Sequence, residues 1–330
     1  NKSKIEWCDH TWNPITGCNH GCHYCYARTM TARFSGDVRL NKMCKADYST
    51  QTGPDESTLY ILDKPMLSET GHPLVYPFGF EPTFHRYRMD TIGKLKMGNN
   101  IFVGAMADVF GEWVPDQWIE EIFTVCLEHD EHNYLFLTKN PERYRKLPQQ
   151  NNFWYGTTVT RPDQEYAWFE SGTYNWFLSI EPILEDFGKF GATVKTAPPW
   201  IIVGAQTGRS KNKVIPEFEW IKNLVLTADT FGIPIFMKDS LIPIVGEKNM
   251  RRDFPKQLLE KTISEKMQNK LYEACSECGK VFRKNQMVAL MARSKRGTPA
   301  KQYAYLCRAC FENSCKNMGV ELPKLDYMED

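Results

Sequence analysis

Short apolar runs rich in β-branched and aromatic residues recur along the chain, and they restrict its fold more than any other feature. The runs span residues 100–108, 134–140, 153–159, 175–184, 200–208 and 233–240. Strands that are apolar on both faces are typical of a parallel sheet with helices on each side. The pattern predicts an α/β fold whose parallel strands form a full or partial βα barrel. A doubly wound open sheet is the alternative.

Two segments between these runs are predicted to be amphipathic helices. In residues 115–129, apolar side chains recur at helical spacing after Pro115, a residue that suits the first turn. Residues 216–232 show the same spacing and end at Gly232, which favours a helix stop. We expect a helix of this kind after each strand.

Two other regions depart from the alternation. Residues 36–98 show little periodicity, and we interpret them as a helix-and-loop insertion within a core that spans residues 1–258. Residues 259–330 change character and carry several cysteines. We expect them to form a separate small module.

Composition indicates a globular protein with reduced thiols. The chain has 330 residues, 11 of them cysteine, and a formal net charge of +1. No apolar run is long enough to span a membrane, and the N-terminal residues lack a secretory signal, so we expect a cytoplasmic protein. Cysteines in such a protein are more typical of metal ligands than of disulfides. The small net charge gives little overall attraction for nucleic acid, although residues 250–301 hold 13 Lys and Arg against 5 Asp and Glu.

Three cysteines lie close together after the first apolar segment. Cys18, Cys22 and Cys25 have the spacing C-x3-C-x2-C, which can bring three thiolates around one 4Fe–4S cluster and leave one iron without a protein ligand. In a βα barrel, the loop after a strand lies at the end where such folds place their chemistry. A structural zinc or iron site, or three unrelated thiols, are the alternatives.

This motif resembles the signature of the radical S-adenosylmethionine superfamily, C-x3-C-x-aromatic-C, with Tyr24 at the aromatic position. The resemblance implies that the free iron binds the methionine part of S-adenosylmethionine. It also implies that an electron from a carrier such as flavodoxin or ferredoxin splits the sulfonium to a 5′-deoxyadenosyl radical. Cofactors of this kind supply the difficult chemistry, and the protein positions them.

The similarity extends over residues 4–258 to the phage-type three-Cys-motif family of radical proteins. The matching blocks are, in order, IEWCDHTWNPITGC with CYA, FVGAMADVF, FLTKNPERY, YGTTV, LSIEPIL, WIIVGAQTG and FMKDSL with RRDFP. One branch of that family is queuine lyase, which releases 7-aminomethyl-7-deazaguanine from queuine by carbon–nitrogen bond cleavage. The resemblance thus implies a deazaguanine base as substrate and a part in queuosine salvage, a branch of tRNA modification.

Polar residues close several of the apolar runs, where they would line a ligand pocket. Asp108 could accept a hydrogen bond from the ammonium of S-adenosylmethionine or from the substrate, or it could cap the next helix. Lys139 could pair with the methionine carboxylate, and the hydroxyl of Thr158 could bind the same carboxylate or the ribose. His20, inside the cysteine loop, is interpreted as a solvent-facing residue.

Further candidates follow the later strands. Ser179 and Glu181 lie two residues apart, and therefore on one face of a strand. Glu181 is our candidate for binding the N–H edge of a deazaguanine, because a buried carboxylate requires a ligand or a basic partner. Gly204 would let the backbone approach adenine closely. Gln206 stands where the family pattern has a carboxylate, and it alters the charge at that strand end.

The C-terminal module contains two C-x2-C pairs, Cys275 with Cys278 and Cys307 with Cys310. Four thiolates arranged in this way predict a tetrahedral structural zinc site, and a second iron–sulfur cluster is the alternative. The basic residues between the pairs suit either a nucleic-acid contact or a β-hairpin with KRGTP at its turn.

Three classes of function remain at this stage. The first is a radical lyase acting on a small deazaguanine base. The second is a radical enzyme that modifies or repairs bases in tRNA or DNA, and the third is a non-catalytic metal-binding protein of the phage type. The small net charge favours the first over the second, whereas the basic segment favours the second.

Overall fold

The structure is a computed structural model of the 330-residue chain. It describes residues 3–95, 98–169, 173–188, 197–208, 213–260, 272–274, 276–277, 281–283, 287–292 and 301–317. Residue contacts divide the chain into two units, Asn1–Thr262 and Ile263–Asp330. Each unit is described by itself.

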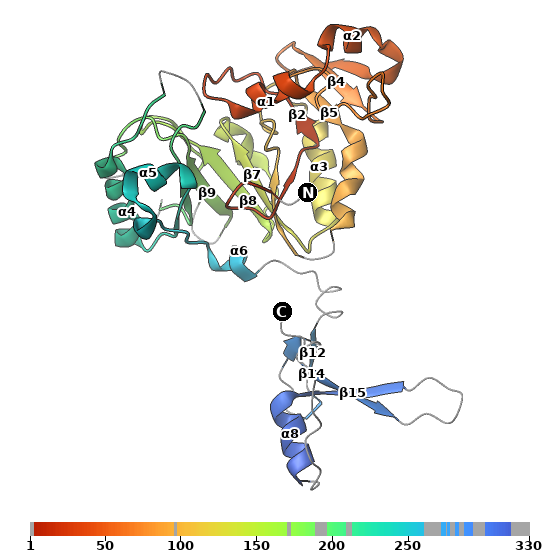
Figure 1. The fold of residues 1–330 in the computed structure, drawn as a ribbon, viewed down its shortest axis with the longest axis vertical. Coiled ribbons are helices and arrows are strands. Elements are labelled where there is room, and N and C mark those ends of the chain that lie inside the picture. Colours follow the sequence, from red (N-terminus) through yellow and green to blue (C-terminus); the bar gives the residue numbers. More distant parts are fainter. Residues whose placement is uncertain are drawn as a thin grey trace. The chain divides into compact units, whose positions relative to one another are not determined.

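A parallel seven-stranded sheet forms the centre of the first unit (Figure 1). Its strands are β1 (His10–Trp12), β6 (Asn100–Val103), β7 (Asn133–Thr138), β8 (Phe153–Thr158), β9 (Asn175–Ile180), β10 (Ile201–Val203) and β11 (Ile235–Met237). They lie side by side in this same order, and every neighbouring pair is parallel. A doubly wound sheet would reverse its strand order at one point. The sheet instead curls in one direction into a half-barrel, which confirms the predicted parallel α/β fold in its partial-barrel form.

Alternating side chains along each strand divide the core into two layers. The concave face of the half-barrel is filled mainly by aromatic rings. Its buried residues are Trp7, Phe102, Leu135, Trp154, Phe177, Trp200, Ile202, Phe236 and Leu258. The residues between them point to the opposite face, where helices cover them. This double burial explains why the strands are apolar throughout.

Two helices match the predicted segments. Helix α3 (Asp116–Glu128) begins after Pro115, and α4 (Phe218–Phe231) ends at Gly232, which has a φ of +65°. Four shorter elements, η4 (Asp239–Leu241), α5 (Ile242–Val245), η5 (Glu247–Asn249) and α6 (Lys256–Glu260), follow β11. Among the described residues of the whole chain, no helix is long and apolar enough to cross a bilayer.

The expectation of a helix after every strand is wrong after β7 and β8, and the described residues after β9, 181–188 and 197–200, form no helix either. Strand β7 is followed only by the 3-10 helix η3 (Pro141–Lys146). After β8, the described residues up to Phe169 form no helix. There the side-chain oxygen of Gln164 accepts hydrogen bonds from the backbone N–H groups of Thr160 and Arg161, at 2.6 and 3.1 Å. These hydrogen bonds hold residues 160–164 in a turn.

The interpretation of residues 36–98 as helices and loops is also wrong in part. Strands β3 (Ser49–Thr52), β4 (Thr58–Leu62) and β5 (Thr83–His85) lie in this segment. They join β2 (Ile15–Thr16) in a second sheet, ordered β2-β5-β4-β3. These strands are short, and β2 and β5 are far apart in the sequence. The alternation of apolar and polar residues within the segment was therefore too brief to indicate strands. The helical elements of this segment are α2 (Val38–Met43), η1 (Lys45–Asp47) and η2 (Arg86–Lys94), and α1 (Tyr26–Phe34) precedes it.

The second unit contains two antiparallel strand pairs and a helix. Strand β12 (Tyr272–Ala274) pairs with β13 (Val281–Arg283), and β14 (Met287–Ala292) pairs with β15 (Lys301–Cys307). The second pair is antiparallel, as the hairpin alternative requires, and its expected turn at residues 295–299 lies outside the described residues. Helix α8 (Arg308–Asn317) follows directly.

The predicted zinc ligands fall mostly outside the described parts of the structure. Cys275 and Cys278 are not among the described residues, and the side chain of Cys307 is not described. Cys310 lies in the first turn of α8. The zinc site therefore stays a prediction.

Candidate active site at the carboxyl end of the half-barrel

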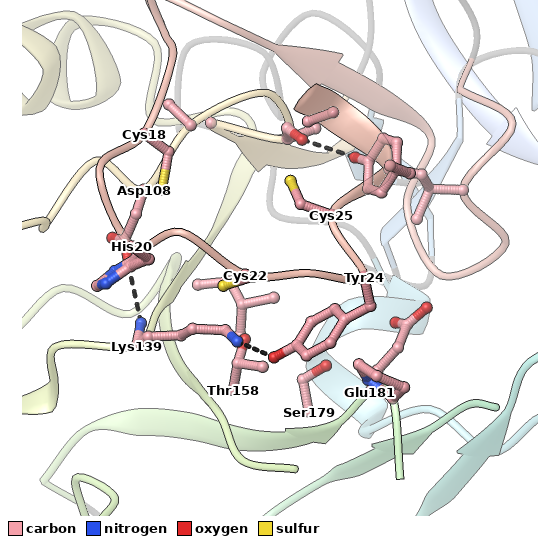
Figure 2. Close-up of a pocket in the computed structure, with 18 of the residues that line it drawn as sticks. Cys18, His20, Cys22, Tyr24, Cys25, Asp108, Lys139, Thr158, Ser179 and Glu181 are labelled. Atoms are coloured by element: carbon pink, nitrogen blue, oxygen red, sulfur yellow. Dashed lines mark hydrogen bonds and ion pairs between the residues drawn. The ribbon is translucent and has the colours of Figure 1, made fainter. Parts of the chain in front are cut away.

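A cavity of about 380 Å³ opens where the carboxyl ends of the parallel strands meet the cysteine loop (Figure 2). This volume lies within the range of small-molecule sites. The polar and sulfur-bearing side chains that line it are Cys18, His20, Cys22, Tyr24, Cys25, Tyr26, Asp108, Thr138, Lys139, Thr158, Ser179, Glu181, Gln206, Thr207 and Lys238. They come from the loop after β1 and from the ends of β6 to β11, as expected for a βα barrel.

All three cysteines of the C-x3-C-x2-C motif line this cavity and are partly buried. The backbone N–H of Cys18 donates to the carbonyl of Phe80 at 3.2 Å, so the turn that precedes β5 holds one end of the loop. At the other end, Cys25 is the N-cap residue of α1. Among the described residues, no three His, Cys, Asp or Glu side chains lie close enough together to hold a single metal ion.

The three thiols fit an iron–sulfur cluster by their chemistry, because thiolates are its usual ligands and all three face the same cavity. Burial raises the pKa of the Cys18 thiol to about 12; a backbone hydrogen bond from His20 opposes this rise and the Asp108 carboxylate adds to it. Without a metal, this thiol stays protonated at neutral pH.

Asp108 joins three segments of the site. Its carboxylate accepts hydrogen bonds from the Thr138 hydroxyl at 2.8 and 2.9 Å and from the backbone N–H groups of Lys139 at 2.9 Å and Phe110 at 3.0 Å. His20 Nε2 lies 2.7 Å from its Oδ2. Protein groups thus contact both oxygens, and Asp108 holds the cysteine loop against the end of β7. The interpretation of His20 as a solvent-facing residue is wrong, since its ring also packs edge-on against Trp113.

The ammonium of Lys139 reaches into the cavity and donates a hydrogen bond to the Tyr24 hydroxyl (Figure 2). The same ammonium lies 4.6 Å from the centre of the Tyr24 ring, a cation–π distance. Burial alone would lower the pKa of Lys139, but its contacts with Tyr24 and Cys22 outweigh burial, and the pKa is raised. A permanent positive charge therefore lies beside the cysteine loop.

Across the cavity, Lys238 Nζ donates to Glu181 Oε1 in an ion pair whose side chains are 19% and 26% exposed. The basic partner that a buried carboxylate requires is therefore Lys238, from the end of β11. Gly204 leaves room for this pair, because a Cβ atom there would lie 3.2 Å from Lys238 Cδ and 3.3 Å from Glu181 Cγ. Gly204 supports the wall without lining it.

Two further polar groups differ in how they are paired. The hydroxyl oxygen of Ser179 is buried and has no hydrogen-bond partner in the described structure, although its residue lines the cavity. An unpaired buried hydroxyl of this kind is costly unless a ligand or water binds it. Gln206 Oε1 accepts from the backbone N–H of Val214 at 3.1 Å.

The structure brings together nearly all the residues expected at this site. Of the predicted candidates, only Gly204 does not line the cavity. Sequence reasoning missed the role of His20 and the presence of Trp7 and Tyr26 in the cavity wall. Nothing local in the sequence marks His20, because its partner lies 88 residues away. Tyr26 could have been found from its position directly after the last cysteine.

Fold and site together define a class of protein, a parallel α/β half-barrel with a thiol-lined cavity at the carboxyl ends of its strands. Residues 2–268 match the family described as "Protein of unknown function (DUF5131)", and the chain belongs to that family. No curated protein and no solved structure gives a significant match.

Proposed function

We propose that the protein is a radical S-adenosylmethionine enzyme. The observation that carries the proposal is that Cys18, Cys22 and Cys25 line one cavity at the carboxyl end of a parallel half-barrel. In this proposal each cysteine binds one iron of a 4Fe–4S cluster. When bound, the cluster and S-adenosylmethionine together supply a 5′-deoxyadenosyl radical that removes a hydrogen atom from the substrate.

The chain's own residues would hold S-adenosylmethionine by charge and by hydrogen bonds. Lys139 offers its ammonium to the methionine carboxylate, and Tyr24 keeps that ammonium next to the cysteine loop. The unpaired hydroxyl of Ser179 is available to donate to the same ligand. Thr158 lines the wall between them. Asp108 acts as a positioning residue, because its oxygens already accept from Thr138, Lys139 and Phe110.

For the substrate we propose a deazaguanine base, with queuine lyase as the specific activity. Glu181 supports this choice, since its carboxylate faces the cavity and Lys238 binds one of its oxygens. The remaining lone pairs of its two oxygens can accept from the ring N–H and the exocyclic amine of a guanine-like edge. Cleavage of the carbon–nitrogen bond of queuine would then release 7-aminomethyl-7-deazaguanine. We further propose a cytoplasmic location, where thiols stay reduced.

The test is anaerobic reconstitution with iron and sulfide, followed by dithionite and S-adenosylmethionine. We expect 5′-deoxyadenosine from the wild type and none from Cys22→Ser. No 5′-deoxyadenosine from a wild type that has taken up iron would leave a non-catalytic metal-binding protein. With queuine present, mass spectrometry should show its loss and the appearance of 7-aminomethyl-7-deazaguanine. Glu181→Gln keeps the shape of the side chain but removes its charge, and we expect at least ~10-fold weaker binding of the base.

A radical enzyme acting on tRNA or DNA bases is the competing function. Binding to a polymer through many phosphate contacts falls steeply with salt, whereas binding of a small base does not. A salt titration of tRNA and duplex DNA binding by the whole protein separates the two. Steep, salt-sensitive binding together with no turnover of queuine would favour the polymer substrate.

We also propose a structural zinc ion in the second unit, bound by Cys275, Cys278, Cys307 and Cys310. In the sequence, the first pair lies between β12 and β13, and the second spans the junction of β15 and α8. In zinc sites of this kind a C-x2-C pair presents two thiolates to one metal ion. Metal analysis of protein purified without iron should give one zinc per chain, and Cys310→Ser should lose it. If the second unit instead contained iron and absorbed visible light as an iron–sulfur cluster does, these cysteines would bind a second cluster.

A further inference from the structure

Helices α1 and α2 expose an unusual number of large apolar side chains. Tyr26, Met30, Phe34, Leu40 and Met43 are between 41% and 75% exposed. We call these five residues the α1–α2 surface. Single exposed apolar residues are common, but a group within 18 residues of chain is typical of an interaction site.

The geometry of α1 places three of the five in one row. Tyr26, Met30 and Phe34 lie four residues apart, and therefore on one face of the helix. Only Ala27 and Thr31 of this helix are buried. A surface helix normally turns its apolar stripe toward the core. In α1 the large apolar side chains face solvent instead.

The charges around the α1–α2 surface are mostly positive. Residues 26–45 carry five basic side chains and a single acidic one, Asp37. Arg39 pairs with Asp37, and Lys42 pairs with Glu81 from the second sheet. Arg33 is exposed and lies over the ring of Phe34 at 5.8 Å. Exposed apolar side chains in a segment with an excess of basic residues fit a partner that offers apolar and acidic side chains.

The surface begins at the candidate cluster site. Cys25 is the N-cap residue of α1, and the next two residues, Tyr26 and Ala27, line the cavity. The Tyr26 hydroxyl donates to the carbonyl of Ala105 at 2.6 Å, although half of the side chain remains exposed. A protein docked on this row would lie within a few residues of the proposed cluster ligands.

We propose that the α1–α2 surface docks an acidic one-electron carrier protein, such as a flavodoxin. The inference rests on the proposed function, because only a cluster bound by Cys25 requires an electron there. One electron leaves the carrier's reduced flavin, which becomes the semiquinone, and the oxidised cluster accepts it. Three of the five side chains, Met30, Leu40 and Met43, offer no ring on which a base could stack, which favours a protein partner over a nucleic acid strand.

The test uses the full-length, reconstituted protein and two variants. One is the double variant Met30→Ser/Phe34→Ser, and the other is the charge reversal Arg33→Glu. The matched controls are Leu226→Ser on α4, at an equally exposed leucine, and Lys248→Glu in the 3-10 helix η5 (Glu247–Asn249). Two quantities are measured for each protein. They are the Kd for oxidised flavodoxin by calorimetry, and the rate of 5′-deoxyadenosine formation with reduced flavodoxin or with dithionite.

We expect both surface variants to bind flavodoxin at least ~10-fold more weakly and to lose a similar factor in the flavodoxin-driven rate. Dithionite is a small ion that needs no docking surface, so the rate with it should stay within about twofold of the wild type. The controls should match the wild type in both measurements. Salt should weaken the wild-type complex more than that of Arg33→Glu, because the variant has one basic contact fewer.

Unchanged flavodoxin affinity in both surface variants overturns the proposal. The proposal is also overturned if the surface variants lose tRNA binding and still bind flavodoxin with the wild-type affinity. If dithionite yields no 5′-deoxyadenosine from the wild type, the proposed function fails, and the Kd still decides whether the surface binds the carrier. If the double variant misfolds and loses its iron, the flavodoxin affinity of Arg33→Glu decides whether the proposal holds. This variant changes a single exposed side chain and should fold normally.

Discussion

The imidazole of His20 lies 2.7 Å from the carboxylate of Asp108, which follows it by 88 residues. This contact fastens the middle of the cysteine loop to the carboxyl end of the parallel sheet. The same carboxylate accepts from the Thr138 hydroxyl and from the backbone N–H of Lys139, so it also orders the end of β7. The loop that carries the three thiols is therefore held by the barrel as well as by its own turns.

Replacement of Asp108 by alanine should destabilise both the fold and the loop. The buried donors of Thr138 and Lys139 would lose their acceptor, at a cost of about 2–4 kcal/mol in the free energy of unfolding. Urea titration measures this loss, and iron content after reconstitution should fall with it. His20→Ala removes the contact with Asp108 and the packing on Trp113 but leaves the Thr138 and Lys139 donors paired, so it should cost less in stability. Equal unfolding free energies for Asp108→Ala and the wild type would contradict this role.

Gly156 is required by the aromatic ring beside it. A Cβ atom at this position in β8 would lie 2.3 Å from the ring of Phe177, a fully buried residue of the neighbouring strand. Gly156→Ala should therefore lower the unfolding free energy by roughly 3 kcal/mol, a typical cost of overpacking a core. The second replacement Phe177→Leu should restore part of it, since it removes the clashing atoms. Additive losses in the double variant would show that the two residues are not coupled.

Gly204→Ala tests whether the Glu181–Lys238 pair binds the base. The added methyl group would crowd Lys238 Cδ at 3.2 Å, and the flexible side chain can move away. We expect the free energy of unfolding to change by less than about 1 kcal/mol. The affinity for a deazaguanine base, measured by calorimetry, should fall by ~10-fold because the carboxylate is displaced. Wild-type affinity in this variant would mean that Glu181 does not contact the base.

A buried histidine should make stability depend on pH. Burial lowers the pKa of His132 from 6.5 to about 4, so the unfolded chain binds a proton that the folded chain refuses. The stability that comes from keeping His132 neutral is fully present above the pKa of the unfolded chain, and it is lost as the pH falls from 6.5 toward 4. Between about pH 7 and pH 5 the loss should be roughly 2 kcal/mol. In His132→Asn this pH difference in urea unfolding should shrink, and an unchanged difference would contradict the assignment.

The local pattern of the sequence predicted the sheet better than its connections. The apolar runs at 134–140 and 175–184 coincide with β7 and β9, and the amphipathic segment 115–129 with α3. The connection after β8 was predicted wrongly, because a helix was expected there from the alternation of the other units, whereas the residues after β8 form a turn held by Gln164. The strands of residues 36–98 were missed, since their pairing depends on distant partners such as Ile15–Thr16.

In the candidate site, too, local features were predicted from the sequence and contacts between distant residues were not. Ser179 and Glu181 were expected on one face because side chains alternate along a strand, and both line the cavity. The spacing of the cysteines placed three thiols in one loop. The partner of Glu181 was not predictable in this way, because Lys238 lies 57 residues further along the chain.

The amino-acid sequence by itself determined the parallel α/β fold, the position of the cysteine loop and the inward-facing residues at the strand ends. These properties follow from periodicity within a few residues, which backbone geometry imposes locally. Only the tertiary structure decided that Asp108 binds His20, that Lys238 pairs with Glu181 and that the apolar row of α1 faces solvent. Contacts between distant segments depend on how the sheet curls and on which faces are left uncovered, and no local pattern records either.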